Sequence, residues 1–309
     1  MAHRTIFGKA ALLLGVTSAC VMAQADTGKL LLTGGVSTID GAAGGGLSPW
    51  AVIGSNATDG QTGAAVHVTR ASTKDYGLNS AGLAIGFDNH YEISLARQAF
   101  NTGITGPQLG VPNLVLKQTI VGVKIRVAGD AVLDSDTWKP QIAVGAQFKS
   151  LDSSGLDGTL TTLGAKRAGI DVYVSSSKLF LAQGILVNGT LRATNANQDG
   201  LLGFGASLGG ANNKYQLMPE FSVAYLLSSR IAIGAEYRAM PNNLQVAGAA
   251  AGLGPAGLKG DAWRDFFIAW APSKNVSITA AYVDLGRIVP GTTAGRAQTG
   301  AYVSTQFAF

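Results

Sequence analysis

The sequence predicts an all-β protein: a transmembrane antiparallel up-and-down β-barrel of 12 strands, or of 14 as the alternative, behind a Gly-rich N-terminal segment. In the last strand, apolar Val303, Phe307 and Phe309 alternate with polar Ser304 and Gln306, as expected of a strand between an apolar medium and water. The chain is 47% hydrophobic and 13% charged, yet no stretch after residue 25 is as long as a membrane helix. A closed barrel would also remove the exposed edge of an apolar terminal strand.

Residues 1–25 predict a signal peptide that is cleaved on export to the cell outer membrane. Arg4 and Lys9 give it a cationic start, residues 10–16 form an apolar run, and Ala25 ends a small-x-small cleavage site. The apolar run is too short to span a bilayer. Cys20 leaves lipid attachment as an alternative. With cleavage after Ala25, the exported chain has no cysteine and therefore no disulfide.

Residues 26–60 form the Gly-rich N-terminal segment. The glycines of 41–46 cannot hold regular structure, whereas residues 29–36 and 49–53 are apolar. Two interpretations remain open, namely a plug-like segment within the barrel mouth or lumen, and two extra strands. A phosphate-binding loop is disfavoured, because no Gly-Lys-Ser/Thr motif follows the glycines.

The barrel is predicted over residues 61–309. Its twelve alternating segments are 61–72, 79–88, 90–100, 115–128, 138–150, 167–177, 179–194, 214–227, 229–240, 260–271, 275–286 and 297–309. Most have the length of a tilted membrane strand. Tight turns near Asn89, 177–178, 228–229 and 272–274 alternate with long polar loops, and short turns face the periplasm in bacterial barrels.

The alternation assigns each segment an outer and an inner face. Charge on the lipid side costs roughly 2–4 kcal/mol at mid-bilayer, so charged residues should point inward. Arg97 is the exception, because it falls on the same alternate positions as Ile93 and Leu95, which are predicted to face lipid. Either a bulge shifts the register after Leu95, or the long side chain of Arg97 reaches the rim.

The inner face collects the candidate lumen-lining residues. They are His67, Lys124, Arg126, Lys139, Lys149, Asp171, Arg192, Glu220, Glu236, Arg238 and Asp265. One interpretation is that these charges pair across the lumen and brace it. The other is a pore lining whose charges bias permeation, with a slight preference for anions.

Five stretches carry a resemblance to a known family. They are residues 28–36, 44–50, 128–136, 234–238 and 280–286. In them the chain resembles an uncharacterised proteobacterial outer-membrane family, domain of unknown function 3034, over essentially the whole exported chain. The resemblance implies an outer-membrane barrel and no particular activity. The final Phe307 and Phe309 are also similar to the C-terminal signal of such barrels, which implies recognition by the barrel-assembly machinery.

Catalytic and metal-binding patterns are weak. Ser207 lies in a Gly-x-Ser-x-Gly pattern, but no histidine follows it, and His67 and His90 both precede it. Asp130, Asp134 and Asp136 could supply oxygen ligands for calcium, but the glycine and terminal acid of an EF-hand loop are missing. We therefore predict no catalytic residues, no cofactor and no metal.

These observations predict a protein that is not an enzyme. The preferred function is a porin-like channel for passive or facilitated passage of a small solute, with outer-membrane lipid as its surroundings. A non-conducting scaffold barrel is the alternative, and a barrel hydrolase acting on lipid is the third. Nucleic acid is excluded as a partner, because a net charge of +5 is small for 309 residues and no Lys/Arg cluster exists.

Overall fold

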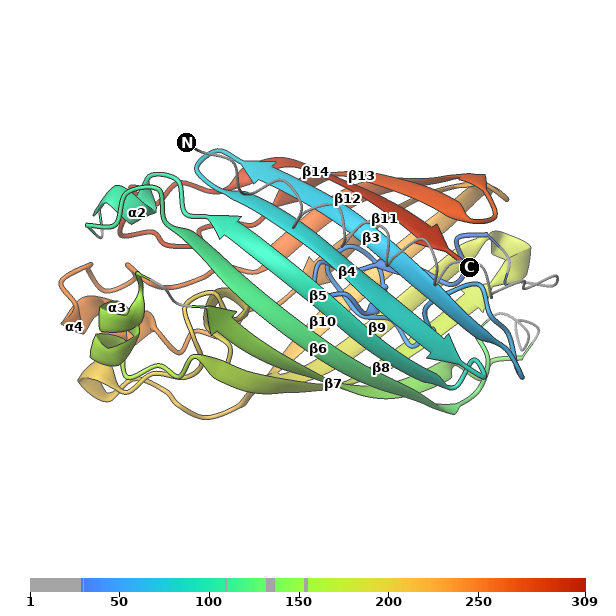
Figure 1. The fold of residues 1–309 in the computed structure, drawn as a ribbon, viewed down its shortest axis with the longest axis horizontal. Helices are drawn as coiled ribbons and strands as arrows, with labels where there is room; N and C mark the ends of the chain where they lie inside the picture. Colours follow the sequence, from blue (N-terminus) through green and yellow to red (C-terminus); the bar gives the residue numbers. More distant parts are fainter. Residues whose placement is uncertain (1–28, 30, 109, 132–136, 153–154) are drawn as a thin grey trace, which may run out of the picture.

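The chain closes into one barrel, as its alternating segments predict. The computed structural model describes residues 29, 31–108, 110–131, 137–152 and 155–309, so the predicted signal peptide lies outside the described residues. Within that part of the chain, twelve antiparallel strands pair in succession, and the last strand, β14, pairs with the first, β3 (Figure 1). The prediction of 12 strands is confirmed, and β1 and β2 form a separate small sheet.

The elements follow one another along the chain with short helices confined to the connections. The two strands of the small sheet are β1 (Val36–Ser37) and β2 (Ala43–Gly44). The barrel strands are β3 (Thr62–Thr73), β4 (Gly77–Phe87), β5 (Tyr91–Asn101), β6 (Val115–Ala128), β7 (Gln141–Asp152), β8 (Ala168–Phe180), β9 (Ile185–Thr194), β10 (Gln216–Ser228), β11 (Ile231–Arg238), β12 (Trp263–Ser273), β13 (Val276–Asp284) and β14 (Thr299–Ala308). The helical turns are α2 (Thr105–Gln108), α3 (Asp157–Leu163), η1 (Leu181–Gln183), η2 (Asn197–Gly200), η3 (Leu208–Gly210) and α4 (Gln245–Ala250). In the described residues no helix has the length and apolar character needed to cross a membrane.

One predicted turn is wrong. The sequence places a turn at 177–178, but β8 continues to Phe180 and the chain reverses through η1. Gly184 makes this turn possible because it adopts a φ of 67°, which a residue with a Cβ rarely tolerates. The apolar run from Leu179 to Leu181 hides the turn in a hydrophobicity pattern, since turns are usually marked by polar residues.

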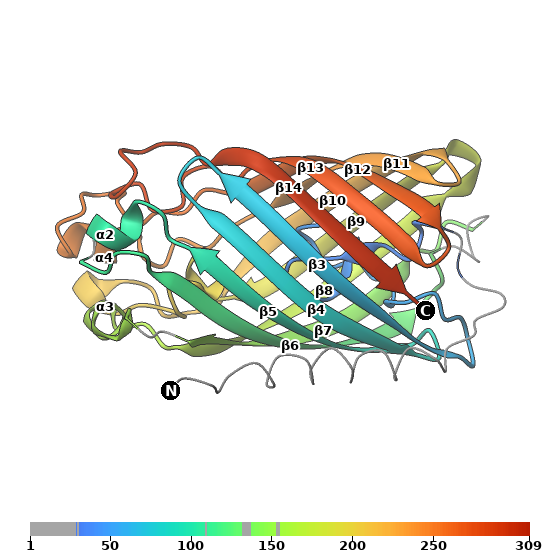
Figure 2. The ribbon, with the colours of Figure 1, turned by 45° about the horizontal axis from the view of Figure 1, so that its top comes forward.

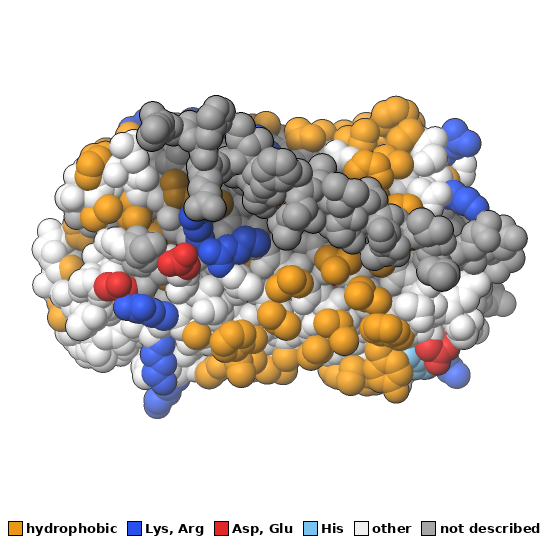
Figure 3. Space-filling view, viewed as in Figure 1, with side chains coloured by type: hydrophobic (Ala, Val, Ile, Leu, Met, Phe, Trp, Pro, Cys, Tyr) orange, Lys and Arg blue, Asp and Glu red, His pale blue; other side chains and the backbone are white. Residues whose placement is uncertain are grey.

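The outer surface of the barrel is apolar. On β5, Tyr91, Ile93 and Leu95 are about half exposed, whereas the intervening Glu92 and Ser94 are each 2% exposed. Figure 3 shows apolar side chains gathered over the barrel wall of this face, with charged side chains toward its two ends. Soluble proteins rarely expose so extensive an apolar surface, so we assign this belt to membrane contact.

Arg97 reaches the rim of this belt. The ladders of β5 with β4 and β6 run without a register shift, which removes the bulge interpretation. The guanidinium of Arg97 hydrogen-bonds the hydroxyl of Thr119 and lies 3.5 Å from a carboxylate oxygen of Asp152, the last residue of β7. The side chain therefore satisfies its charge at the strand ends instead of in hydrocarbon.

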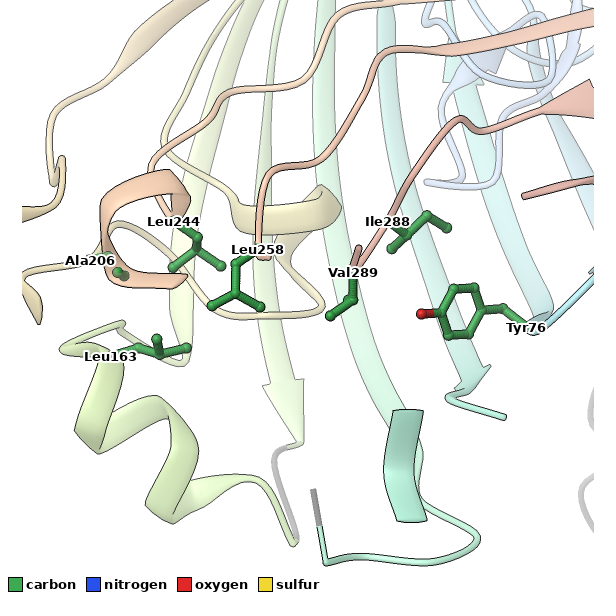
Figure 4. Packing of buried hydrophobic residues seen from close by; sticks show 8 residues of the cluster. Tyr76, Leu163, Ala206, Leu244, Leu258, Ile288 and Val289 are labelled. Carbon is green, nitrogen blue, oxygen red and sulfur yellow. The ribbon is translucent and has the colours of Figure 1, made fainter. Parts of the chain in front are cut away.

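The long loops pack into a cap over one end of the barrel. Figure 4 shows Tyr76, Leu163, Leu244 and Leu258 among the buried side chains of this cap, and they come from three different connections. A side-chain pair supports its edge, since Arg287 donates to Asp261 at 2.7 and 2.9 Å and holds the pKa of Asp261 below its usual value. The outer loops thus have a hydrophobic core of their own.

The N-terminal segment enters the barrel. Residues 33–57, which we call the lumen segment, run inside the wall in Figures 1 and 2, and nearly all of them are buried. Its regular pairing consists of a two-residue ladder between β1 and β2 and one bridge between Gly44 and Pro49. The described residues 33–57 therefore lie in the lumen, and their two short strands do not join the barrel sheet.

We expect Gly44→Ala to loosen the lumen segment. A Cβ on Gly44 would lie 2.1 Å from the carbonyl oxygen of Ser48 and 2.8 Å from the Cα of Pro49, and backbone atoms cannot move aside cheaply. Overpacking of this kind costs about 1–3 kcal/mol. Faster proteolysis of the lumen segment in the folded barrel would show it. The matched control is Gly158→Ala in α3, where nothing lies within 4 Å of the added Cβ; equal proteolysis of both variants would contradict the prediction.

Candidate functional site

The lumen segment is held at a first point by one wall carboxylate. Glu236 on β11 accepts hydrogen bonds from the backbone N–H groups of Gly46 at 2.6 Å, Leu47 at 2.8 Å and Ser48 at 3.3 Å. Ser222 on β10 donates to the same carboxylate at 2.8 Å. Gly45 permits this close approach, because a Cβ there would lie 2.0 Å from a Glu236 carboxylate oxygen. The glycines of the segment therefore create a backbone surface that fits an acidic side chain, not a phosphate.

A buried ion pair holds the segment at a second point. Glu92 on β5 accepts from the N–H groups of Ala43 at 3.1 Å and Gly54 at 2.7 Å. Lys124 on β6 donates to Glu92 at 3.1 Å and to the carbonyl oxygens of Ala43 and Val52 at 2.8 Å each. Anion and cation together bind buried backbone donors and acceptors of the lumen segment.

Neutral side chains complete the attachment. The carbonyl oxygen of Pro49 accepts from Thr190 at 2.7 Å and from Ser175 at 3.1 Å. Ala51 donates its N–H to Ser177 at 2.8 Å, and its carbonyl oxygen accepts from Gln141 at 2.6 Å. The wall side chains thus replace the backbone ladder that an irregular segment lacks.

A central ion cluster lies farther along the lumen. It consists of Asp40 from the lumen segment, Asp199 from η2, and Lys149, Asp171, Arg192, Glu220 and Arg238 from the wall, all at most 3% exposed. One carboxylate oxygen of Asp40 lies 3.2 Å from Lys149, 3.2 Å from Arg238 and 3.7 Å from Arg192. Three cations therefore converge on a carboxylate that belongs to the inserted segment and not to the wall.

Asp199 enters the same cluster from the loop between β9 and β10. Its carboxylate oxygen lies 2.5 Å from both Lys149 and Arg238. The remaining partners are wall acids, with Asp171 at 3.3 Å and Glu220 at 2.6 Å from Arg192. Buried charges are stable only when paired, so the cluster depends on both inserted carboxylates.

The predicted lumen-lining residues separate into five groups. Lys149, Asp171, Arg192, Glu220 and Arg238 meet in the central ion cluster, Lys124 pairs with Glu92, and Glu236 binds the lumen segment. Glu236 and Asp265 are direct neighbours across β11 and β12. His67 is buried opposite Gly82 and Gln306, and no described residue hydrogen-bonds its ring.

The last group lies at the short-turn end of the barrel. Arg126 is buried near the end of β6 and pairs with Asp130 at 2.8 Å and Asp59 at 3.1 Å. Lys139 is not in the lumen: it is exposed, precedes β7, and its carbonyl oxygen accepts from Lys178 at 3.2 Å. The alternation in the sequence runs on to Lys139 although the strand itself begins at Gln141. Pro140, which lacks an N–H, marks that start.

Sequence reasoning missed three residues of the site. Glu92 was detectable, since it lies between the outward Tyr91 and Ile93 of a predicted strand. Asp40 and Asp199 lie in irregular segments that have no periodic pattern. Both pair with Lys149, which is 109 residues from Asp40 and 50 residues from Asp199 in the sequence. No local pattern could have assigned them.

The residues considered for catalysis and metal binding do not form one site. Ser207 lies in the cap, His67 within β3, and His90 in the turn between β4 and β5 at the opposite end of the barrel. Asp134 and Asp136 lie outside the described residues, and Asp130 pairs with Arg126. Across the described part of the chain, no three His, Cys, Asp or Glu residues are grouped as metal ligands.

An apolar cavity of about 40 Å³ borders the central ion cluster on its cap side. Ile39 and Leu47 of the lumen segment line it together with the wall residues Trp263 and Tyr302, and Asp199 reaches it from η2. Trp263 also lies under the guanidinium of Arg238, 5.7 Å from the ring centre. The lumen therefore has an apolar compartment directly beside one that contains buried charges of both signs.

One family model and several solved structures are similar to this chain. A family model described as "Protein of unknown function (DUF3034)" matches residues 33–306. The solved KdgM porin in complex with disordered oligogalacturonate is similar at 11% identity, over 79% of this chain and 99% of that chain, with a TM-score of 0.48. The NanC porin is similar at 11% identity, over 80% of this chain and 100% of that chain, with a TM-score of 0.49. The outer membrane phospholipase A of Escherichia coli is similar at 10% identity, over 80% of this chain and 92% of that chain, with a TM-score of 0.42. No curated protein matches the sequence.

Proposed function

Because the chain belongs to DUF3034, a family of unknown function, we propose a function from its own geometry: a porin-like outer-membrane barrel that passes a small solute when the lumen segment moves. In its resting state the barrel is closed by the lumen segment and by the cap. Opening displaces the segment from the wall. The scaffold barrel is the competing function, and it requires that the segment never leaves.

The observation that carries this proposal is the polarity of the contacts between the lumen segment and the wall. Glu236, Glu92, Lys124 and the central ion cluster hold the segment, and all are buried. For a permanent filling, apolar packing of similar volume is often as stable as buried ion pairs or more so. A charged wall has a specific advantage when water replaces the segment, because water satisfies the exposed groups.

The wall left by the departing segment suits an aqueous pathway. Serine, threonine and glutamine side chains such as Ser175, Thr190 and Gln141 bind the segment backbone now, and the same groups can bind water. A lumen lined by polar groups and pairs of opposite charge is typical of porins. The cap must separate as well, and its location at the long-loop end makes it the outer gate.

We expect a disulfide between Gly54→Cys and Ala84→Cys to keep the barrel closed. A Cβ on Gly54 would lie 3.3 Å from that of Ala84 on β4, close to the roughly 3.5–4.5 Å that disulfides span. With the signal peptide removed after Ala25, no other cysteine can form a competing disulfide. Voltage-induced openings in planar bilayers should disappear in the oxidised protein and return on reduction.

The two single-cysteine variants are the controls, and reductant should leave their currents unchanged. Equal currents from the oxidised and reduced double variant would show that ions do not need the segment to move. In that case the proposed gating is wrong.

We propose in addition that the C-terminal strand is the part that the barrel-assembly machinery recognises. Phe307 is exposed on the membrane face of β14, and Phe309 closes the barrel through backbone hydrogen bonds with Ala64 at 2.8 and 3.1 Å. An exposed aromatic at the end of the closing strand is accessible before closure.

A further inference from the structure

The lumen segment fills two adjacent compartments with two adjacent side chains. Ile39 lies in the apolar cluster with Trp263 and Tyr302, and it lines the cavity. The next residue, Asp40, places its carboxylate among Lys149, Arg192 and Arg238. An apolar group joined to a carboxylate is therefore the chemistry that this part of the lumen already binds.

Displacing the segment leaves both compartments without an occupant. The three cations then face the three remaining carboxylates Asp171, Asp199 and Glu220, whereas four carboxylates face them while Asp40 is present. Withdrawal of Ile39 and Leu47 enlarges the apolar cavity against Trp263. An incoming carboxylate with an apolar body can restore the contacts of Asp40 and of Ile39 together.

On this basis we propose that the solute is a small organic acid with an apolar body, such as an aromatic carboxylate, and that Asp40 occupies its carboxylate site in the closed state. The proposal rests on the proposed channel function. Lys149 and Arg238 bind the carboxylate, and Trp263 packs against the body. Arg238 is fixed for this role from both sides, by Glu220 at 3.5 Å and by the Trp263 ring.

Three probes separate the two compartments. Phenylacetate has a carboxylate and an apolar body, 2-phenylethanol has the body without the charge, and acetate has the charge without the body. Calorimetric titration of the refolded full-length Asp40→Asn protein should detect phenylacetate binding at least about tenfold tighter than binding of either partial probe, since each compartment contributes separately. The unsubstituted protein should bind phenylacetate about tenfold more weakly than Asp40→Asn, because Asp40 competes for the same cations.

Asp261→Asn is the matched control, because it removes a carboxylate from the cap edge and leaves the lumen contacts intact. It should bind phenylacetate like the unsubstituted protein. Lys149→Gln combined with Asp40→Asn should lose the preference for phenylacetate over 2-phenylethanol. Should that double variant fail to fold, Trp263→Ala with Asp40→Asn should instead lose the preference for phenylacetate over acetate.

Potassium chloride currents of the same proteins keep the two hypotheses apart. If Asp40→Asn conducts but binds the three probes equally, the organic-acid proposal is wrong and the channel stands. If phenylacetate binds selectively and no variant conducts, the solute site stands and the channel function is wrong. Equal phenylacetate affinity in the unsubstituted and Asp40→Asn proteins would refute the role assigned to Asp40.

Discussion

A chain that lacks residues 27–58 is expected to conduct ions in long openings that only the cap interrupts, whereas the full-length chain opens only briefly. The deletion removes the lumen segment and leaves β3 to β14 intact, including the closing ladder between β14 and β3. Each charged contact that holds the segment contributes roughly 1.5–3 kcal/mol. Loss of several such contacts should raise the open fraction by far more than about tenfold.

Single-channel recording in planar bilayers measures this result directly. Heat-modifiable electrophoretic mobility and a β-type circular dichroism spectrum establish that the shortened chain has folded. A folded deletion variant that stays silent even after mild proteolysis of the outer loops would contradict the channel and favour the scaffold. Persistent closure by the cap could be identified in the same experiment by mild proteolysis of the outer loops, which should then restore conduction.

Glu236→Ala should release the lumen segment without opening the barrel wall. The substitution leaves the buried N–H groups of Gly46, Leu47 and Ser48 without their acceptor. Leaving such donors unsatisfied costs about 1–3 kcal/mol each. Asp265, the direct neighbour of Glu236 on β12, reduces this cost somewhat, because removal of one acid relieves repulsion between the two.

We therefore expect about 2–4 kcal/mol of lost attachment, or about 30-fold or more faster proteolysis of residues 33–57. Conductance should rise in parallel. Glu236→Gln is the control, because its amide oxygen still accepts from the backbone. Its rate of proteolysis should lie between those of the unsubstituted protein and Glu236→Ala. Unchanged proteolysis in Glu236→Ala would show that Glu92 and Lys124 suffice to hold the segment.

The barrel was predictable because a membrane strand is a local pattern. Tyr91, Ile93 and Leu95 meet lipid, their neighbours face the lumen, and no distant residue needs to be known. Failures occurred where the pattern loses its physical basis. The turn at η1 is apolar, so no polar residues mark it. Lys139 continues the alternation of polar and apolar residues although it lies before the start of β7.

The contents of the lumen were only partly predictable. The alternation of the strands predicts that Lys149, Arg192 and Arg238 face inward. It does not show whether they brace the lumen or line a pore. The deciding partners, Asp40 and Asp199, come from segments whose positions depend on the closed barrel around them. Long-range pairing of this kind leaves no trace in the spacing of one sequence.

The lumen segment is continuous with β3, and this connection fixes the direction in which it can travel. β3 begins at Thr62, beside the short turn that follows Phe87, so the tether lies at the periplasmic rim. A segment that moves as proposed would therefore leave toward that side. A force applied to the segment from the periplasmic side would break its contacts with the wall one after another, whereas pressure from outside would press the segment against the wall.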